Sequence, residues 1–256
     1  MQRQHTNKMD GMVAIVTGAS RGLGRAIAKE FAAEGAKVVV SARRSSPTGL
    51  PGTAVETANQ IRDEGGEAMA LTCDVSDEEQ VMAMVGQTID MYGRIDVLVN
   101  NAGVMVLGET LLDIAPDTWD ESVAANLKGP YLCSRAVLAT MIQQRSGSII
   151  NIGSRMGSDH QQGGGVLYSA TKAAVHMFSL CLAEELREHN IAVNILSPGG
   201  LKTEGSAAIP WAQGDWEQRV EPEAVGPSAV YLAMQDASTF TGQLVLRAEF
   251  GETWGK

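Results

Sequence analysis

A glycine-rich loop between an apolar strand and a helix constrains the fold of this chain most strongly. The run 12–17 is short and apolar, as expected of a strand covered on both faces of a sheet. The loop Thr-Gly-Ala-Ser-Arg-Gly-Leu-Gly (17–24) follows, and Leu23, Ile27 and Phe31 then recur at helical spacing. Glycine permits a tight turn, and the free N–H groups at a helix N-terminus attract anions. In this setting the loop predicts a dinucleotide pyrophosphate site rather than a plain turn.

Apolar runs and helical segments alternate along the rest of the chain. Further strands are expected at 37–41, 68–72, 95–99, 148–152, 191–196 and 243–246, and helices at 22–34, 53–64, 77–92, 116–145, 168–188 and 222–234. This alternation predicts an α/β fold, a Rossmann-type doubly wound parallel sheet of about seven strands with helices on both faces. The step Gly129-Pro130 is expected to bend its long helix. No linker divides the chain, so we expect a flexible tail at 1–10 and a single domain at 11–256.

Charge and cysteine content exclude several classes of partner. The net charge of −10 argues against nucleic acid and against an anionic membrane surface, because both require clustered Lys and Arg. No apolar run approaches the ~18–20 residues of a membrane helix, and the first ten residues lack an apolar signal core. The cytoplasm is therefore the expected location. Three widely spaced cysteines, Cys73, Cys133 and Cys181, predict buried free thiols, with neither a disulfide nor a metal site.

The end of the second strand bears on the choice of cofactor. An acidic residue there would bind the adenosine ribose of NAD, whereas a basic residue would accept the 2′-phosphate of NADP. The chain reads Ser41-Ala-Arg-Arg44, and Arg21 adds a positive charge within the glycine loop. We therefore expect NADP(H) to be preferred over NAD(H). A solvated basic turn with no ligand is the alternative.

Seven short motifs follow one another in a fixed order. They are Thr17-Gly-x-x-x-Gly-x-Gly24, Asp74-Val75, Asn100-Asn-Ala-Gly103, Asn126, Ser154, Tyr168-x-x-x-Lys172 and Pro198-Gly199. Together they resemble the short-chain dehydrogenase/reductase family over about 11–251, and in particular its 3-oxoacyl-carrier-protein reductase-like branch. The resemblance implies an NADP(H)-dependent oxidoreductase, a carbonyl reductase that interconverts a ketone and a secondary alcohol by hydride transfer.

The resemblance also implies which residues bind the cofactor. Asp74 would hydrogen-bond the adenine amino group, cap a helix or turn, or do both, and Gly103 could be purely structural. Pro198, Gly199 and Thr203 would contact the nicotinamide. The expected cofactor-binding set is Gly18, Ser20, Arg21, Gly22, Leu23, Gly24, Arg43, Asp74, Val75, Asn100, Ala102, Gly103, Tyr168, Lys172, Pro198, Gly199 and Thr203.

Four residues, Asn126, Ser154, Tyr168 and Lys172, resemble the catalytic tetrad of the family. Tyr168 would act as acid and base, with its pKa lowered from about 10 by the nearby ammonium of Lys172 and by the oxidised nicotinamide. The spacing of four residues places both side chains on one helix face. Lys172 would also hold the nicotinamide ribose, and Ser154 would hydrogen-bond the substrate oxygen. Asn126 would hold a water that relays protons to Lys172, or else satisfy local backbone.

Some features depart from the family pattern. The distance from Ser154 to Tyr168 is one residue longer than is commonest, Arg155 stands where small or apolar residues are usual, and the segment 248–251 (Ala-Glu-Phe-Gly) replaces the near-terminal Asp-Gly-Gly. Helices at about 117–145 and 168–188 resemble those of the family's dimer interface. We expect a homotetramer, with a homodimer as the alternative.

The substrate is less constrained by the sequence. Residues 201–220 lie where the family has its substrate lid, and Trp211 and Trp216 could cover an apolar substrate or merely dock the lid. His160 could touch substrate or be a solvated loop residue. The net charge, with Ala139 and Glu184 at positions where carrier-protein reductases have arginine, favours a small ketone or secondary alcohol. A 3-oxoacyl-thioester reductase, a non-catalytic nucleotide-binding regulator and a structural subunit are the alternatives.

Overall fold

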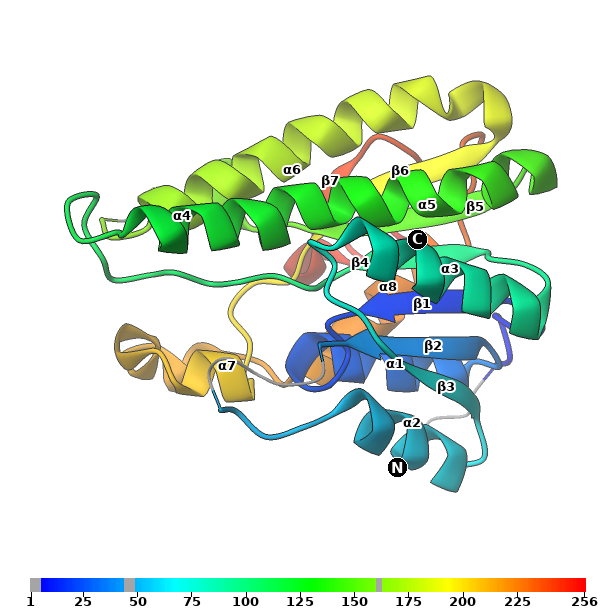
Figure 1. Ribbon diagram of the computed structural model, residues 1–256, viewed down its shortest axis with the longest axis horizontal. Helices are drawn as coiled ribbons and strands as arrows, with labels where there is room; N and C mark the ends of the chain where they lie inside the picture. Colours follow the sequence, from blue (N-terminus) through cyan, green and yellow to red (C-terminus); the bar gives the residue numbers. More distant parts are fainter. Residues whose placement is uncertain (1–5, 44–48, 160–162) are drawn as a thin grey trace.

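The chain forms a seven-stranded parallel sheet. The computed structural model describes residues 6–43, 49–159 and 163–256, without the side chains of 210 and 211. The strand order is β3-β2-β1-β4-β5-β6-β7, and every pair is parallel. The strands are β1 (Val13–Thr17), β2 (Lys37–Ala42), β3 (Glu67–Thr72), β4 (Val97–Asn100), β5 (Gly147–Ile152), β6 (Ile191–Ser197) and β7 (Leu244–Leu246). The predicted doubly wound Rossmann-type fold is confirmed (Figure 1).

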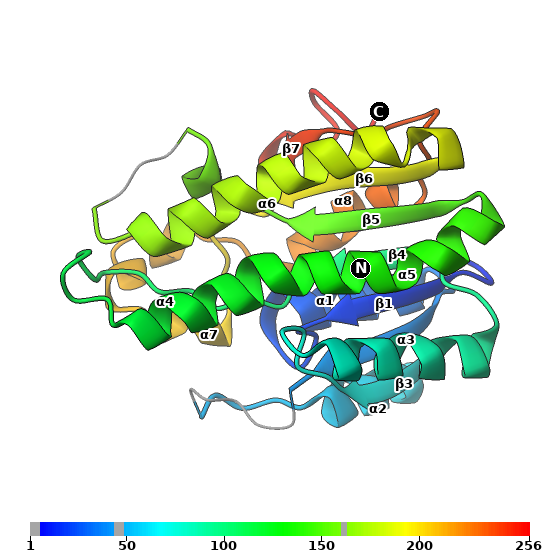
Figure 2. The same cartoon turned by 45° about the horizontal axis from the view of Figure 1, so that its top comes forward.

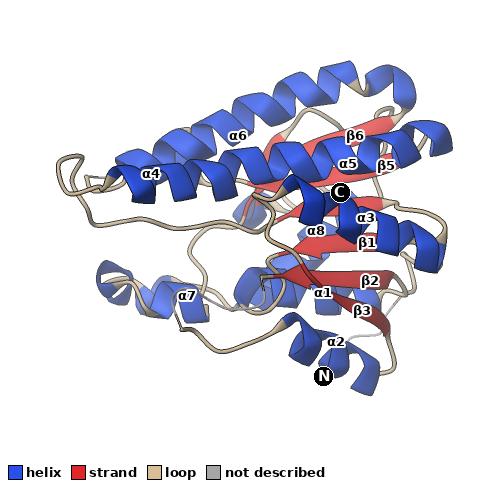
Figure 3. Cartoon of the chain, viewed as in Figure 1, coloured by secondary structure: helices blue, strands red, loops and turns tan. Residues whose placement is uncertain are grey.

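Helices cover both faces of this sheet (Figures 1 and 3). One face carries α1 (Gly22–Ala33), α2 (Ala54–Asp63) and α8 (Gly226–Ala233), and the other carries α3 (Glu78–Tyr92), α5 (Gly129–Gln144) and α6 (Val166–Glu185). Alternate residues of β1 pack on opposite faces of the sheet. Ala14 and Val16 belong to the hydrophobic cluster with α1, and Ile15 belongs to the hydrophobic cluster with α3 and α5. Burial on both faces explains why the central strands are continuous apolar runs.

The strand order reverses at β1, and this reversal places the functional site. The chain leaves β1 toward β2 and β3 on one side and later returns to β4 on the other. In open α/β sheets ligands bind beyond the carboxyl ends of the strands at such a switch point. In Figures 1 and 2 the arrowheads of the strands point to the end of the molecule where α4 (Pro116–Val123) and α7 (Glu204–Ala207) lie.

The long helix expected at 116–145 is interrupted rather than simply bent. A π-helical turn, Ala124–Lys128, separates α4 from α5. Pro130 follows directly, and because it lacks an N–H group it cannot donate to the carbonyl of Asn126 as an α-helix would require. Gly129 also matters, since a Cβ there would lie 2.7 Å from Cγ2 of Val75. The π turn therefore sits at the predicted site residue Asn126, as such turns often do at functional sites.

The described part of the N-terminal segment does not behave as the flexible tail expected over 1–10. Met9 is fully buried, and its N–H donates to the carbonyl of Glu34 at 2.8 Å. The carboxylate of Glu34 accepts from the Thr6 hydroxyl at 2.8 Å and from the Lys8 N–H at 3.2 Å. One apolar anchor and one carboxylate thus fix residues 6–10 to the end of α1, while residues 1–5 lie outside the described ranges.

Two further expectations need correction. Cys73 and Cys133 are buried free thiols as predicted, but Cys181 is exposed on α6. By length and composition alone, α6 is also long and apolar enough to cross a membrane, against the expectation that no run approaches this length. Leu167, Val175 and Leu182 are nevertheless buried, so α6 packs as a core helix of this domain.

Candidate active site

The glycine loop approaches the end of β4 too closely for side chains. Gly18 has a φ of +64°, and a Cβ there would lie 2.7 Å from Cα of Ala102. A Cβ on Gly24 would lie 2.5 Å from the Gly18 carbonyl. The side-chain amide of Asn101 donates to the carbonyls of Thr17 and Gly18 at 2.9 and 3.1 Å. The loop is thus a narrow backbone cradle, and Asn101, which the sequence analysis did not assign to the site, holds it.

Asn100 stabilises the centre of the sheet. Its amide donates to the side-chain oxygen of Asn151 at 2.8 Å and to the Ser134 hydroxyl at 3.2 Å. Asn151 in turn donates to Ser179 of α6 at 2.8 Å. Buried polar groups require such partners. The side chain of Asn100 therefore joins β4, β5, α5 and, through Asn151, α6 at the carboxyl end of β4.

A carboxylate occupies the anion-binding end of α1. The Gly22 N–H donates to Oε2 of Glu204 at 3.0 Å, and Oε1 of Glu204 pairs with Arg25. Arg21, the N-cap residue, makes no side-chain capping bond. Leu23 belongs to the core, so only its backbone can serve a ligand. The carboxylate of Glu204, from the expected lid, thus binds at the N-terminus of α1. Helix N-termini favour anions, so the cradle fits a pyrophosphate.

The expected adenosine-side residues lie at the ends of β2 and β3. Arg43 is exposed and lies 3.5 Å from Glu121 of α4, while Arg21 donates to the Gly52 carbonyl at 3.4 Å. Asp74 accepts from the N–H and hydroxyl of Ser76 at 3.0 and 2.7 Å. Asp74 thus caps a turn, the role left open as its alternative. Arg44 lies outside the described residues.

Tyr168, Lys172 and Ser154 meet at the carboxyl end of β5. Lys172 is 7% exposed, its Nζ donates to the Ile152 carbonyl at 2.7 Å, and Nζ lies 5.6 Å from the centroid of the Tyr168 ring. Ser154 is the N-cap of a 3₁₀ turn, Arg155–Gly157, and its Oγ accepts from the Met156 N–H at 3.2 Å. Ser154 also hydrogen-bonds the Tyr168 side chain. Residues that are 14 positions apart in sequence are therefore brought into contact.

Burial controls the ionisation of this group. It raises the pKa of Tyr168 to about 12, against a lowering by the hydrogen bond with Ser154. It lowers the pKa of Lys172 to about 8. Without a nicotinamide, the cost of a buried phenolate dominates the pKa of Tyr168. The expected lowering by Lys172 and the oxidised nicotinamide together stays a prediction. Nζ of Lys172 donates to the Ile152 carbonyl and faces the tyrosine ring. With its pKa raised to about 12, Tyr168 keeps its proton at neutral pH.

The side chain of Asn126 is engaged in a local brace. Its Oδ1 accepts from the Val104 N–H at 2.7 Å, and its amide donates to the Val104 carbonyl at 2.8 Å and to Oγ1 of Thr171 at 3.1 Å. A Cβ on Gly103 would lie 2.9 Å from Oδ1 of Asn126, so Gly103 has a structural role. The amide therefore satisfies local backbone, the alternative left open above, and ties the 103–104 segment to α6.

The segment expected to contact the nicotinamide, 198–203, runs directly into the expected lid at 201–220. Gly199 has a φ of +78°, and the Pro198 carbonyl accepts from Nε of Arg247 at 3.3 Å. Thr203 caps α7, since its Oγ1 accepts from the Ser206 N–H at 3.1 Å. A Cβ on Gly22 would lie 3.3 Å from Cγ2 of Thr203, so the lid begins directly over the glycine loop.

The two ends of the expected lid, 201–220, contact each other. Leu201 and Val220 form a β-bridge, and the Lys202 N–H donates to the Val220 carbonyl at 2.8 Å. Trp216 is half-buried, whereas the side chain of Trp211 and the whole of His160 lie outside the described residues. The roles proposed for Trp211 and His160 therefore remain predictions.

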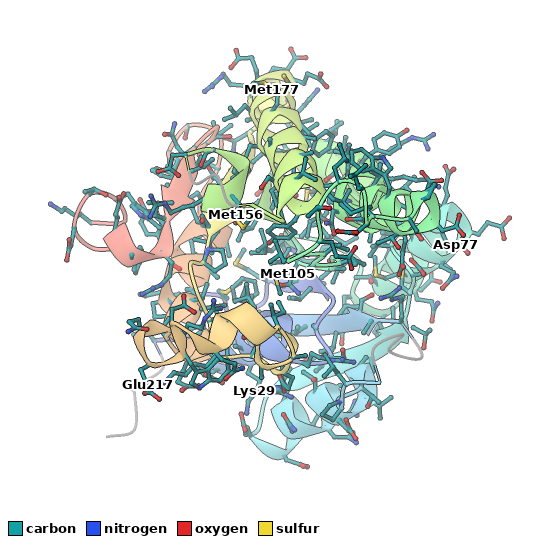
Figure 4. All side chains as sticks on the ribbon, turned by 90° about the vertical axis from the view of Figure 1, so that its left-hand side faces the viewer. Lys29, Asp77, Met105, Met156, Met177 and Glu217 are labelled. Atoms are coloured by element: carbon teal, nitrogen blue, oxygen red, sulfur yellow. The ribbon has the colours of Figure 1, made fainter. Side chains whose placement is uncertain are left out.

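Two methionines lie on the face of the molecule that carries the expected active site. Figure 4 looks along the sheet onto the carboxyl ends of the strands and places Met105 and Met156 near the middle of this face, between α6 above and the lid segment with Glu217 below. Met105 is 42% exposed, and Met156 lies two residues after Ser154. In the described ranges no group of three or more His, Cys, Asp or Glu could hold a metal ion.

Comparison with known proteins identifies the family. The family model for short chain dehydrogenase matches residues 12–213. A 3-oxoacyl-[acyl-carrier-protein] reductase of Synechocystis is 39% identical over 92% of this chain and 94% of its own length. Elsinochrome reductase 1 of Elsinoe fawcettii is 36% identical over 82% of this chain and 75% of its own length. A metagenomic short-chain oxidoreductase solved in complex with NADP superposes with a TM-score of 0.77 at 36% identity, over 93% of this chain and 98% of that one. The chain is an oxidoreductase that belongs to the short-chain dehydrogenase family.

Proposed function

We propose that this protein is an NADP(H)-dependent carbonyl reductase that interconverts a ketone and a secondary alcohol. The observation that carries the proposal is the meeting of Tyr168, Ser154 and Lys172 at the carboxyl end of β5, on the same edge of the sheet as the glycine cradle. This edge is where open α/β sheets bind dinucleotides. Binding groups and proton-transfer groups are therefore adjacent.

The cofactor would supply the hydride, and the chain would supply its binding site. The N–H groups at the start of α1 would receive the pyrophosphate, and Arg21 and Arg43 would face the 2′-phosphate. Lys172 would hold the nicotinamide ribose, with Pro198 and Gly199 at the ring. The NADP complex of a 36% identical structure supports the preference for NADP(H).

In the reductive direction, Tyr168 would donate its proton to the carbonyl oxygen of the substrate. Its raised pKa keeps the hydroxyl protonated at neutral pH, as an acid catalyst must be. The Ser154 hydroxyl would donate a second hydrogen bond to the same oxygen, and the Lys172 ammonium would stabilise the phenolate that remains. Since the Asn126 amide is committed to Val104 and Thr171, a relay water could bind only its backbone carbonyl, which lacks its α-helical partner at Pro130.

The assembly would be a homotetramer or a homodimer in the cytoplasm. Tyr131 of α5 and Met177 and Leu180 of α6 are exposed apolar residues on the two helices expected at the interface. Burying such a surface against a second copy is favourable. We do not expect nucleic acid or membrane partners, given the net charge of −10.

A 3-oxoacyl-thioester reductase is the second candidate, and its support is the 39% identical relative with this name. The acidic net charge, with Ala139 on α5 and Glu184 on α6, weighs against an acidic carrier protein as partner. A non-catalytic nucleotide-binding regulator is disfavoured because the tyrosine and the lysine are both present and adjacent.

The test is NADPH oxidation with a panel of small ketones, aromatic ketones and 3-oxoacyl thioesters, each repeated with NADH. We expect turnover of a ketone, at least tenfold more efficient in kcat/KM with NADPH, and no turnover by Tyr168→Phe. Preference for a thioester would select the second candidate. Tight NADPH binding without turnover of any compound would contradict the proposal and favour the regulator.

A further inference from the structure

A buried histidine lies beneath the catalytic serine. His176 is 6% exposed and is located on α6, one turn after Lys172 and two turns after Tyr168. Its Nε2 accepts a hydrogen bond from the Ser154 N–H at 3.3 Å. The imidazole thus contacts the backbone of the residue expected to bind the substrate oxygen. The same helix face supplies the tyrosine, the lysine and this histidine.

Two glycines make room for the imidazole. A Cβ on Gly153 would lie 2.6 Å from Nε2 of His176, and a Cβ on Gly157 would lie 2.9 Å from its Cε1. These glycines flank the short turn that carries Ser154. Any other residue at either position would displace the ring or the turn, so the turn and the imidazole fit only together.

The hydrogen bonds of His176 require one neutral tautomer. Burial lowers its pKa, the positive charge of Lys172 lowers it further, and a hydrogen bond with the Gly157 backbone raises it. Because Nε2 accepts from the Ser154 N–H, a neutral ring carries its proton on Nδ1. The ring therefore holds the start of the turn through Ser154, and its Cε1 lies close to Gly157 at the other end.

We propose that His176 is a positioning residue for Ser154. It fixes the backbone of 154–157 through the hydrogen bond that Nε2 accepts and through the close fit of the ring against Gly157, and thereby orients the Ser154 hydroxyl toward Tyr168 and the substrate oxygen. The orientation of the Ser154 hydroxyl matters because a displacement of about 1 Å in a catalytic group can reduce turnover by roughly 100-fold. The inference rests on the proposed reductase function, in which Ser154 binds the carbonyl oxygen.

The test compares two variants of His176 with a control on the same helix. His176→Leu removes the acceptor of the Ser154 N–H, whereas His176→Gln retains an acceptor near the original position. Ser179→Ala, one turn further on, removes a buried hydrogen bond to Asn151 but touches neither Ser154 nor Gly157. For each protein we would measure kcat with the best ketone of the panel, the Kd for NADPH and the melting temperature.

We expect His176→Leu to lower kcat about 10- to 100-fold with an NADPH Kd within about twofold of wild type. We expect His176→Gln to recover most of the loss, and Ser179→Ala to melt lower without loss of kcat. In a Ser154→Ala background, His176→Leu should cause little further loss, because the two residues act as one unit. An equal fold loss in both backgrounds, or an unchanged kcat in a folded His176→Leu protein, would overturn the proposal.

A spectroscopic measurement separates this inference from the proposed function. The nitrogen NMR spectrum of the imidazoles, with the His176 signals assigned from His176→Gln, reports the tautomer without any substrate. We expect a proton on Nδ1 and a bare Nε2 at pH 7. A proton on Nε2 would overturn the inference whether or not a ketone is reduced, whereas a failed ketone panel with the expected tautomer would count against the proposed function alone.

Discussion

Replacing Glu204 with Gln should tighten NADPH binding and destabilise the protein without NADPH. The carboxylate of Glu204 binds the Gly22 N–H at 3.0 Å and pairs with Arg25, at the helix end where the pyrophosphate is proposed to bind. Two anions cannot share this helix end, so NADPH must displace the carboxylate. The Glu204 and Arg25 side chains are only 25% and 30% exposed, so solvent screens their pairing incompletely.

The expected magnitude follows from these contacts. An anion at a helix N-terminus contributes about 0.3–2 kcal/mol, and a partly exposed ion pair adds about 1 kcal/mol or less. Because Gln retains a weaker hydrogen bond, we expect a net change of about 1 kcal/mol, which is about fivefold in Kd. The melting temperature without NADPH should fall by about 2–4 °C.

Protonation of Glu204 should act in the same direction as this substitution. Burial tends to raise its pKa, but hydrogen bonds with its own backbone N–H, with Arg25 and with Gly22 outweigh burial and hold the pKa below 4.5. Its contribution to the free energy of unfolding is therefore present above pH 4.5 and is lost as the pH falls through the lower, folded-state pKa.

The assay is NADPH binding followed by fluorescence titration, with thermal melting of the same samples. Glu217→Gln is the matched control, because Glu217 is an exposed carboxylate of the same lid and the charge change is identical. The control should leave both the NADPH affinity and the melting temperature within error. An unchanged or weaker NADPH affinity in Glu204→Gln would refute the reasoning.

Three further predictions concern the cofactor, the brace and the buried lysine. Arg43→Glu should lower kcat/KM with NADPH by at least tenfold and spare NADH, because an acid repels the 2′-phosphate; equal losses with both cofactors would contradict this. Asn126→Ala should lower the free energy of unfolding in urea by about 1–3 kcal/mol, since it leaves the partly buried N–H and carbonyl of Val104 unpaired; an unchanged midpoint would argue against the brace. Lys172→Met should be inactive yet more stable than wild type at pH 7 by about 1–3 kcal/mol, because the pKa of Lys172 falls from 10.5 to about 8 on burial. This advantage should shrink as the pH rises from about 8 to 10.5, where the folded wild type has lost the proton and only the unfolded chain still holds it, and parallel stability curves would contradict it.

The features that sequence predicted well are those with local causes. The glycine cradle follows from close approach of backbone segments, and the four-residue spacing of Tyr168 and Lys172 follows from helix geometry. Strand positions followed from short apolar runs buried on both faces of the sheet. These signals lie within a few residues of one another, so one sequence suffices to see them.

The features that sequence could not predict depend on distant partners. Asn126 meets Val104 and Thr171, which are 22 and 45 positions away, and Glu204 meets Gly22 across 182 positions. Nothing at Glu204 itself signals this contact. Thr171 and His176 could have been found from their places on the helix face of Tyr168, but their partners could not.

Ionisation and exposure also depend on the completed fold. The pKa of Tyr168 rises because its hydroxyl is buried, and the hydrogen bond with Ser154 offsets this rise only in part. Cys181 lies in an apolar stretch yet points away from the sheet, since its helix neighbours Leu182 and Ala183 take the inward positions. The apolar neighbours of Cys181 therefore led to a wrong prediction for this thiol.

The central claim is that Tyr168 is the proton donor of a ketone reduction, and Tyr168→Phe tests it most directly. The measurement is the single-turnover rate of NADPH oxidation with saturating ketone, together with the Kd for NADPH. The account predicts a rate lower by about 10²–10⁴-fold, with Kd within about threefold of wild type, because only the hydroxyl is removed. A rate within about threefold of wild type would show that another group supplies the proton and would contradict the account.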